Sequence, residues 1–151
     1  MMRKLLLPML VVACFYCSVP AWASTPSDTV ASVESAWAAA FVKLDVAALS
    51  SLYTEDATQF GSTAKLAIGR NEIRQYFDGL SKDAKWGVKF GEQHVTALSK
   101  TTIATSGFAL FTKELGGNVT ELPYRITFVL VRVGREWRIA VHHFSPTPKA
   151  S

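Results

Sequence analysis

Cysteine is scarce in this chain of 151 residues, because Cys14 and Cys17 are the two present and both lie near the amino terminus. Residues 24–151 contain none, so this part of the chain cannot close an internal disulfide or build a thiolate metal site. The three histidines also lack the spacing of common zinc motifs. We therefore expect no metal and no cofactor, and the stability of the domain has to come from packing.

A strong excess of one charge is also missing. The chain carries 16 basic and 12 acidic residues, which gives a formal charge of +4. Arg3 and Lys4 lie in the first few residues, and residues 24–151 are close to balanced without them. A balanced surface argues against nucleic acid as a partner.

Apolar runs are too short to span a bilayer, which takes about 20 residues. The run from Leu5 to Tyr16 follows two basic residues, is interrupted by Pro8, and leads to a small-residue site that ends at Ala23. This pattern is typical of a signal peptide. We predict a signal peptide over residues 1–23, cleaved after Ala23, and a periplasmic or secreted product with no membrane contact after cleavage.

The amino terminus also permits a second interpretation. Residues 11–14, Val-Val-Ala-Cys, resemble a lipoprotein cleavage box, which would leave Cys14 lipidated. The aromatic Phe15 directly after it and the better cleavage site at Ala23 favour the soluble product.

Residues 24–151 have the size of one domain with a single core. Three stretches in its first half repeat apolar residues at the spacing of an α-helix: 30–44, 46–52 and 73–80. A short polar residue that can cap a helix precedes each of them. These expected caps are Ser27 or Asp28, Asp45, and Asn71.

The second half of the domain is rich in β-branched and aromatic residues. Four such stretches, near 86–98, 101–113, 123–133 and 136–145, are separated by turn residues, and residues 58–68 indicate a short earlier strand pair. Helices first and an antiparallel meander last predict an α+β domain with the helices on one face of the sheet.

The last long strands are apolar on both faces. Phe128 and Leu130 point one way while Val129 and Val131 point the other. A sheet with one solvated face would alternate more cleanly between apolar and polar residues. We therefore expect a homodimer that uses the outer face of the sheet.

Several segments resemble one family of proteins. Residues 123–129 (PYRITFV) followed by residues 137–145 (WRIAVHHFS) resemble the end of SnoaL-like proteins of the SgcJ/EcaC type. Residues 69–77 resemble their third helix, and residues 47–56 resemble their second helix and the turn after it. The resemblance implies the nuclear transport factor 2-like cone, in which about three helices pack on a strongly curved, mostly antiparallel sheet around a cavity open at one end.

The same carboxyl-terminal pattern is similar to the association domain of calcium/calmodulin-dependent protein kinase II. Trp137, His143, Ser145 and Pro148 match its pattern, whereas Phe144 stands where that domain carries an arginine in its pocket. This departure argues against the same anionic ligands. Relatives of this fold include cyclases, isomerases, dehydratases and scaffolding domains, so the resemblance implies no single chemistry.

His142 and His143 are neighbours on the last strand, so their side chains leave opposite faces of the sheet. The bulkier alternation, with Phe128 and Phe144, predicts that His142 points into the cavity and His143 points outward. Histidine exchanges protons near neutrality, so His142 is a catalytic candidate, although a structural histidine with a hydrogen-bond partner fits the pattern as well.

Other polar residues have two interpretations each. Tyr53 and Asp56 could form a phenol and carboxylate pair of the ketosteroid-isomerase kind, but Asp56 could equally close a turn, and Tyr53 also fits the packing stripe of a helix. Arg125 could bind an anion, but we expect it to pair with Glu121 or Glu136.

Two hypotheses about function follow. The first is an exported protein that binds a small apolar or aromatic molecule, with acid–base activity of the isomerase, cyclase or dehydratase kind left open. The second is a noncatalytic association module. For the first hypothesis the expected pocket wall consists of Trp37, Phe41, Tyr53, Tyr76, Phe108, Phe128, His142 and Phe144.

Overall fold

The computed structural model describes residues 24–149, so the predicted signal peptide lies outside the described residues. None of the helices in this range is both long and apolar enough to cross a membrane. The elements in chain order are α1 (Pro26–Val42), α2 (Val46–Ser51), β1 (Tyr53–Phe60), β2 (Leu66–Ile68), α3 (Gly69–Asp78), β3 (Lys85–Ser99), β4 (Thr102–Leu115), β5 (Asn118–Val133) and β6 (Glu136–Pro146).

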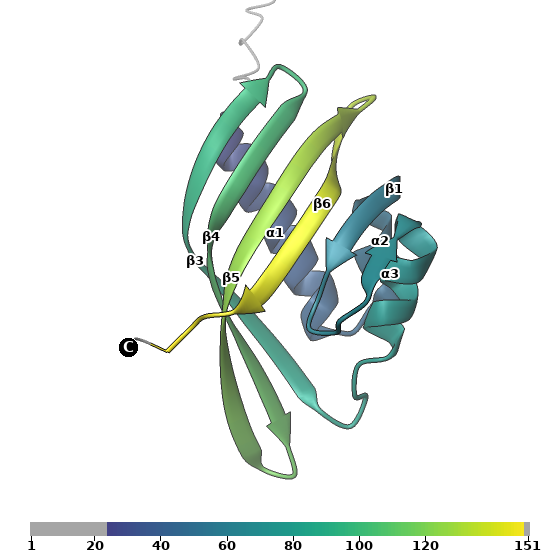
Figure 1. The fold of residues 1–151 in the computed structure, drawn as a ribbon, viewed down its shortest axis with the longest axis vertical. Coiled ribbons are helices and arrows are strands. Elements are labelled where there is room, and N and C mark those ends of the chain that lie inside the picture. Colours follow the sequence, from purple (N-terminus) through teal and green to yellow (C-terminus); the bar gives the residue numbers. More distant parts are fainter. Residues whose placement is uncertain (1–23, 150–151) are drawn as a thin grey trace, which may run out of the picture.

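The six strands form one sheet in the order β2-β1-β6-β5-β4-β3. Neighbouring strands are antiparallel except β1 and β6, which run parallel. Figure 1 shows the curved sheet, with α1 lying across one face and α3 beside β1. The predicted α+β architecture, with three helices on a curved and mostly antiparallel sheet, is confirmed.

The helix starts differ in part from the predicted caps. Asp45 caps α2 as predicted, through its bond from the Ala48 N–H. The N-cap of α1 is Thr25, which forms a capping box with Asp28, so Asp28 assists the cap from the third helical position. The predicted cap at Asn71 is wrong, because α3 begins at Gly69, whose φ of 80° turns the chain out of β2.

The core lies between the helices and the inner face of the sheet. Its largest fully buried side chains come from α1, β1, α3 and the long strands, so every layer of the fold contributes to it. Burying such a side chain contributes about 1.5–3 kcal/mol, which replaces the cross-links that the described residues lack. The largest are Trp37, Tyr53, Phe77 and Phe128.

Phe108 is the one residue of the predicted pocket wall that lies on the wrong face. Its side chain is 56% exposed. Phe128 on β5 pairs with Thr105 on β4, and residues directly opposite each other share a face of the sheet. Ile103, Thr105 and the other odd-numbered residues of this stretch therefore point inward, and Phe108 points outward.

A bulge changes the alternation along β6. Val129 pairs with Val141 but Leu130 pairs with Ile139, so Ala140 is the extra residue. Ile139 and His142 consequently both point inward, and both are fully buried. Strict alternation back from His143 would place Ile139 on the outer face with Val141, and the bulge reverses that assignment.

Candidate functional site

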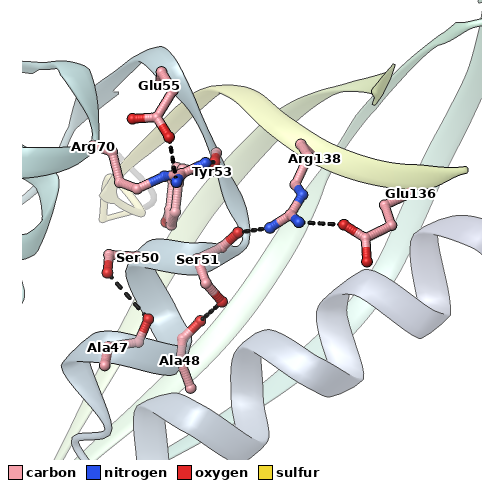
Figure 2. Close-up of polar contacts among 9 residues, drawn as sticks. All are labelled: Ala47, Ala48, Ser50, Ser51, Tyr53, Glu55, Arg70, Glu136 and Arg138. Atoms are coloured by element: carbon pink, nitrogen blue, oxygen red, sulfur yellow. Dashed lines mark hydrogen bonds and ion pairs between the residues drawn. The ribbon is translucent and has the colours of Figure 1, made fainter. Parts of the chain in front are cut away.

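Tyr53 begins β1 directly after α2, and its backbone is held from outside the core. The guanidinium of Arg70, on α3, donates to the carbonyl oxygen of Tyr53 from Nη2 at 2.6 Å and from Nε at 3.1 Å. Glu55 pairs with the same guanidinium at 2.5 Å, as Figure 2 shows. Arg70 therefore links α3 to the first residue of β1 and fixes where the phenol ring enters the core.

A second arginine joins the end of α2 to β6. Arg138 donates to the carbonyl oxygen of Ser51 and pairs with Glu136 (Figure 2). The N–H of Ile139 also donates to the carbonyl oxygen of Leu52 at 2.8 Å. The junction between α2 and β1 is thus attached to β6, the strand that carries the two histidines.

Three buried polar side chains form a hydrogen-bonded chain inside this frame. The indole Nε1–H of Trp37 donates to the Tyr53 hydroxyl at 2.9 Å, and that hydroxyl lies 2.8 Å from Nδ1 of His142. All three residues have no exposed surface. The predicted inward orientation of His142 therefore agrees with the structure, and Tyr53 is its hydrogen-bond partner.

The hydrogen bonds favour one tautomer of the histidine. Indole can only donate, so the Tyr53 oxygen accepts from Trp37, and the phenol hydrogen is paired in this cluster only if Nδ1 of His142 accepts it. Nδ1 then accepts, and the proton of the neutral imidazole sits on Nε2. Nε2 of His142 is buried without a partner, so the ring presents one free N–H donor.

Burial keeps both titratable side chains of this hydrogen-bonded cluster, His142 and Tyr53, in their neutral forms. It lowers the pKa of His142 to about 3, with a smaller contribution from the neighbouring His143. It also raises the pKa of the Tyr53 hydroxyl, although the bond from Trp37 opposes part of that change. At neutral pH the pair can hydrogen-bond to a ligand but is poorly suited to exchanging protons with it.

A small apolar pocket lies beside the hydrogen-bonded side chains of Trp37, Tyr53 and His142. It is at the end of the sheet where α3 and the hairpin of β4 and β5 meet. Its cavity volume is about 70 Å³. Trp37 and Phe144 line it, and their rings also lie 5.7 Å and 5.0 Å from the His142 ring. The other lining residues are Phe41, Ser62, Tyr76, Phe77, Leu80, Trp86, Phe111, Leu122 and Tyr124.

The predicted wall is therefore divided between two layers. Trp37, Phe41, Tyr76 and Phe144 line the pocket. A deeper layer of Tyr53, Phe128 and His142 is fully buried beneath it, and Phe108 belongs to neither layer.

The remaining predicted polar residues lie away from the pocket. Asp56 is exposed in the middle of β1, so it neither closes a turn nor approaches the buried chain. Arg125 donates to the Ser145 hydroxyl at 3.1 Å, and the predicted pairing with Glu121 or Glu136 is not formed. Among residues 24–149 there is no cluster of three or more His, Cys, Asp or Glu that could hold a metal ion.

Sequence reasoning missed Gln59. Its side chain is 1% exposed, it lies opposite His142 in the parallel pair of β1 and β6, and both polar atoms of its amide are unpartnered. The signal was its spacing of two residues from the apolar Ala57, which places the two on the same face of a strand. Glutamine is typical of a surface position, so its residue type gave no indication that Gln59 is buried.

Glu34 was missed as well. It is 8% exposed on the inner side of α1, one turn before Trp37, and its Oε1 has no partner. Burial raises the pKa of this carboxyl to about 7. The interior thus holds a carboxyl group that changes charge near neutral pH.

Solved structures of other proteins share this fold. Two solved structures match the fold with TM-scores of 0.74 and 0.67: a proposed calcium/calmodulin-dependent protein kinase II association domain from Xanthomonas campestris, and a ketosteroid isomerase-like protein from Erwinia carotovora atroseptica. The first is 24% identical and covers 88% of this chain and 94% of its own. The second is 20% identical and covers 80% and 95%.

A proposed scytalone dehydratase from Novosphingobium aromaticivorans is also similar, with a TM-score of 0.75, 13% identity, and coverage of 81% of this chain and 84% of its own. Identities this low establish the fold alone, which is nuclear transport factor 2-like. No curated protein sequence matches the chain significantly. The sequence model of the SnoaL-like domain matches residues 30–149, so the chain belongs to the SnoaL-like family.

Proposed function

We propose that the chain is an exported binding protein whose cone takes up a small, largely apolar molecule at its open end. The observation that carries this proposal is the aromatic pocket in contact with a hydrogen-bonded and neutral Tyr53–His142 pair. Ligand pockets are mostly apolar with a few fixed polar groups, which is the composition found here.

The size of the cavity restricts the ligand. About 70 Å³ is well below the roughly 300–1,000 Å³ of pockets that bury drug-sized ligands. The rim consists of partly buried side chains that pack on the core from its edge, including Tyr76, Leu80 and Tyr124. A ligand of one ring therefore enters as these rim side chains turn outward.

Binding is favoured over acid–base catalysis. Isomerase chemistry on this fold needs a carboxylate base in a dry pocket. No acidic residue lines the pocket, and Asp56 is exposed on the far side of β1. The low pKa of His142 also makes it a weak base.

The proposal is tested by filling the pocket from its rim. Leu80→Trp adds a large ring where Leu80 lines the cavity, and Leu98→Trp makes the same change at an exposed position of β3. Binding of toluene, followed by the fluorescence of the lining tryptophans, is expected to weaken at least tenfold in Leu80→Trp and to be unchanged in Leu98→Trp. Equal binding by both variants contradicts the proposal.

Export is part of the same proposal and has its own test. Amino-terminal sequencing of the protein from the periplasm or culture medium of a bacterial host is expected to begin at Ser24. Recovery of a chain lipidated at Cys14 in the membrane fraction would overturn it.

A second candidate function, association of identical chains, is supported by the outer face of the sheet. Phe60, Phe108 and Val141 are 45%, 56% and 40% exposed there, on three different strands. Apolar side chains gathered on one face are a common basis of subunit contact. The association-domain protein from Xanthomonas campestris has the same fold, which agrees with this candidate.

A further inference from the structure

Gln59 and His142 are, with Thr105, the polar side chains buried most completely in the sheet. They are 1% and 0% exposed. They lie directly opposite each other on the parallel strands β1 and β6, and both side chains point to the inner face. Three of their polar atoms, Nε2 and Oε1 of Gln59 and Nε2 of His142, are buried without a partner.

Unpartnered polar atoms in a core are costly. A buried donor or acceptor that loses its partner costs about 1–3 kcal/mol, so folded proteins pair nearly all such groups. Gln59 and His142 together carry three such atoms, so they have unused hydrogen-bonding capacity that a ligand or a water molecule can fill.

The pocket lies directly next to this pair along the two strands. Two residues further on, at the next inward position, the chain carries Gly61 after β1 and Phe144 on β6. Phe144 lines the pocket. A Cβ at Gly61 would lie 2.6 Å from the ring of Tyr76, another lining residue, so this glycine leaves room for that ring. Two residues of a strand span about 6.6 Å, which is the separation along β6 between His142 and the pocket residue Phe144.

Tyr76 lines the pocket beside Gly61, which lies two residues after Gln59. Its ring lies over Gly61, and its hydroxyl is bonded at the exposed end, from the N–H of Ser62 at 3.1 Å and to the Ser62 hydroxyl at 2.9 Å. Turning of this ring toward solvent would break these two exposed hydrogen bonds, and it is required before a ligand can reach the buried pair.

We propose that Gln59 and His142 form the polar floor of the ligand pocket and select a neutral head group that carries a carbonyl beside an N–H or O–H, such as a primary carboxamide. The inference rests on the proposed function, in which the aromatic pocket binds the apolar part of the ligand. Gln59 and His142 would bind the other end of the same ligand.

The chemistry of the floor sets the head group. Nε2 of His142 and the Gln59 amide nitrogen donate, and Oε1 of Gln59 accepts, so a ligand has to offer both an acceptor and a donor. A charged carboxylate is disfavoured, because an ion transferred into a site without a counter-charge loses its hydration. Arg70, the cation of α3 that contacts the start of β1, is already engaged by the Tyr53 carbonyl and Glu55.

The test compares three ligands that share one ring: toluene, benzamide and benzoate, titrated at pH 7 by calorimetry into the protein. Benzamide is expected to bind at least tenfold more tightly than toluene, and benzoate no more tightly than toluene. In Gln59→Leu, benzamide is expected to weaken about tenfold while toluene is unchanged. Gln75→Leu, the same change at an exposed position of α3, is expected to leave all three affinities unchanged.

The possible outcomes separate the two proposals. Toluene binding without a preference for benzamide, or a preference that survives in Gln59→Leu, overturns the polar floor and leaves the apolar pocket standing. Either result would mean that internal water satisfies Gln59. If neither toluene nor benzamide binds, both proposals are wrong. Circular dichroism confirms folding of each variant, and Gln59→Met, with an unbranched side chain, replaces Gln59→Leu if the latter fails to fold.

Discussion

His142 and His143 are adjacent on β6, and they illustrate how different the two faces of this sheet are. His142 is fully buried among aromatic rings and bonded to Tyr53, whereas His143 is exposed and meets Phe60 of β1 edge to face at 6.0 Å. Adjacent positions of β6 thus carry one imidazole buried in the core and one at the surface. The inner face is therefore where chemistry or binding can depend on geometry, and the outer face is available to another subunit.

The largest expected difference between the faces is in stability. Phe128→Ala on the inner face is expected to lower the free energy of unfolding by about 3–5 kcal/mol, because a 1% exposed phenyl ring leaves a cavity. Phe108→Ala, the same change at a 56% exposed position of the outer face, is expected to cost under about 1 kcal/mol. Urea denaturation measures both. Similar losses would mean that the assigned faces are wrong.

The next largest effect separates the buried hydroxyl from an exposed one. Tyr53→Phe leaves the Trp37 N–H and Nδ1 of His142 without partners, so the free energy of unfolding is expected to fall by about 2 kcal/mol or more. Tyr76→Phe removes hydrogen bonds only at the exposed end of its ring and is expected to cost less than about 1 kcal/mol. A larger loss in Tyr76→Phe would contradict this account of the buried chain.

A pH dependence follows from the two buried titratable groups. The pKa of His142 is about 3 in the folded protein against an ordinary 6.5, so the unfolded chain binds the extra proton between these values and stability falls as the pH drops below 6.5. Glu34 acts in the opposite direction. Its folded pKa is about 7 against an ordinary 4.5, so the folded protein binds the extra proton and stability falls as the pH rises through this window.

The contributions of His142 and Glu34 to stability oppose each other between pH 4.5 and 6.5. Removing the carboxyl of Glu34 leaves the contribution of His142 unopposed. Glu34→Gln is expected to lose stability more steeply than the parent protein on acidification through this range, by about 1.4 kcal/mol per pH unit at most. Glu92→Gln, at an exposed position of β3, is the control and is expected to follow the parent curve. Parallel curves for Glu34→Gln and the parent would contradict the raised pKa of Glu34.

The smallest expected effect on stability comes from a substitution on the outer face, where the expected change is in the association of chains. Val131→Asp places a charge beside Val129 on the partly exposed face of β5, where it is expected to reduce the mass in light scattering from dimer to monomer while the chain stays folded. A matched change outside this face, Val42→Asp at the 50% exposed end of α1, is expected to leave the mass unchanged. If Val131→Asp has no effect on mass, the proposed face of association is wrong.

The sequence predicted the fold well because its signals are local. Helical spacing around Trp37 and strand alternation around Phe128 each depend on a few neighbouring residues. Phe108 was assigned to the wrong face because the inward side of β4 depends on its register with β5, a pairing between distant residues. Strict alternation along β6 fails at Ile139 for a related reason, since the bulge at Ala140 has no marker such as glycine.

The candidate site was harder to predict than the fold. His142 and Tyr53 were found because their residue types invite chemistry, but their contact joins positions 89 residues apart. Gln59 was missed because the property that makes it unusual, an amide without partners beside a histidine, arises only when β1 pairs with β6. Burial of a polar group is a tertiary property, and residue type alone argues against it.

The central claim, that the inner face binds a small apolar molecule and the outer face does not, is tested most directly by nuclear magnetic resonance. Toluene is titrated into the isotope-labelled protein, and chemical-shift changes are mapped on both faces. We predict saturable changes at Trp37, Tyr76 and Phe144, which line the pocket, and none at Phe60 or Phe108. Changes confined to Phe60 and Phe108, or no saturable change at any residue, would contradict the account.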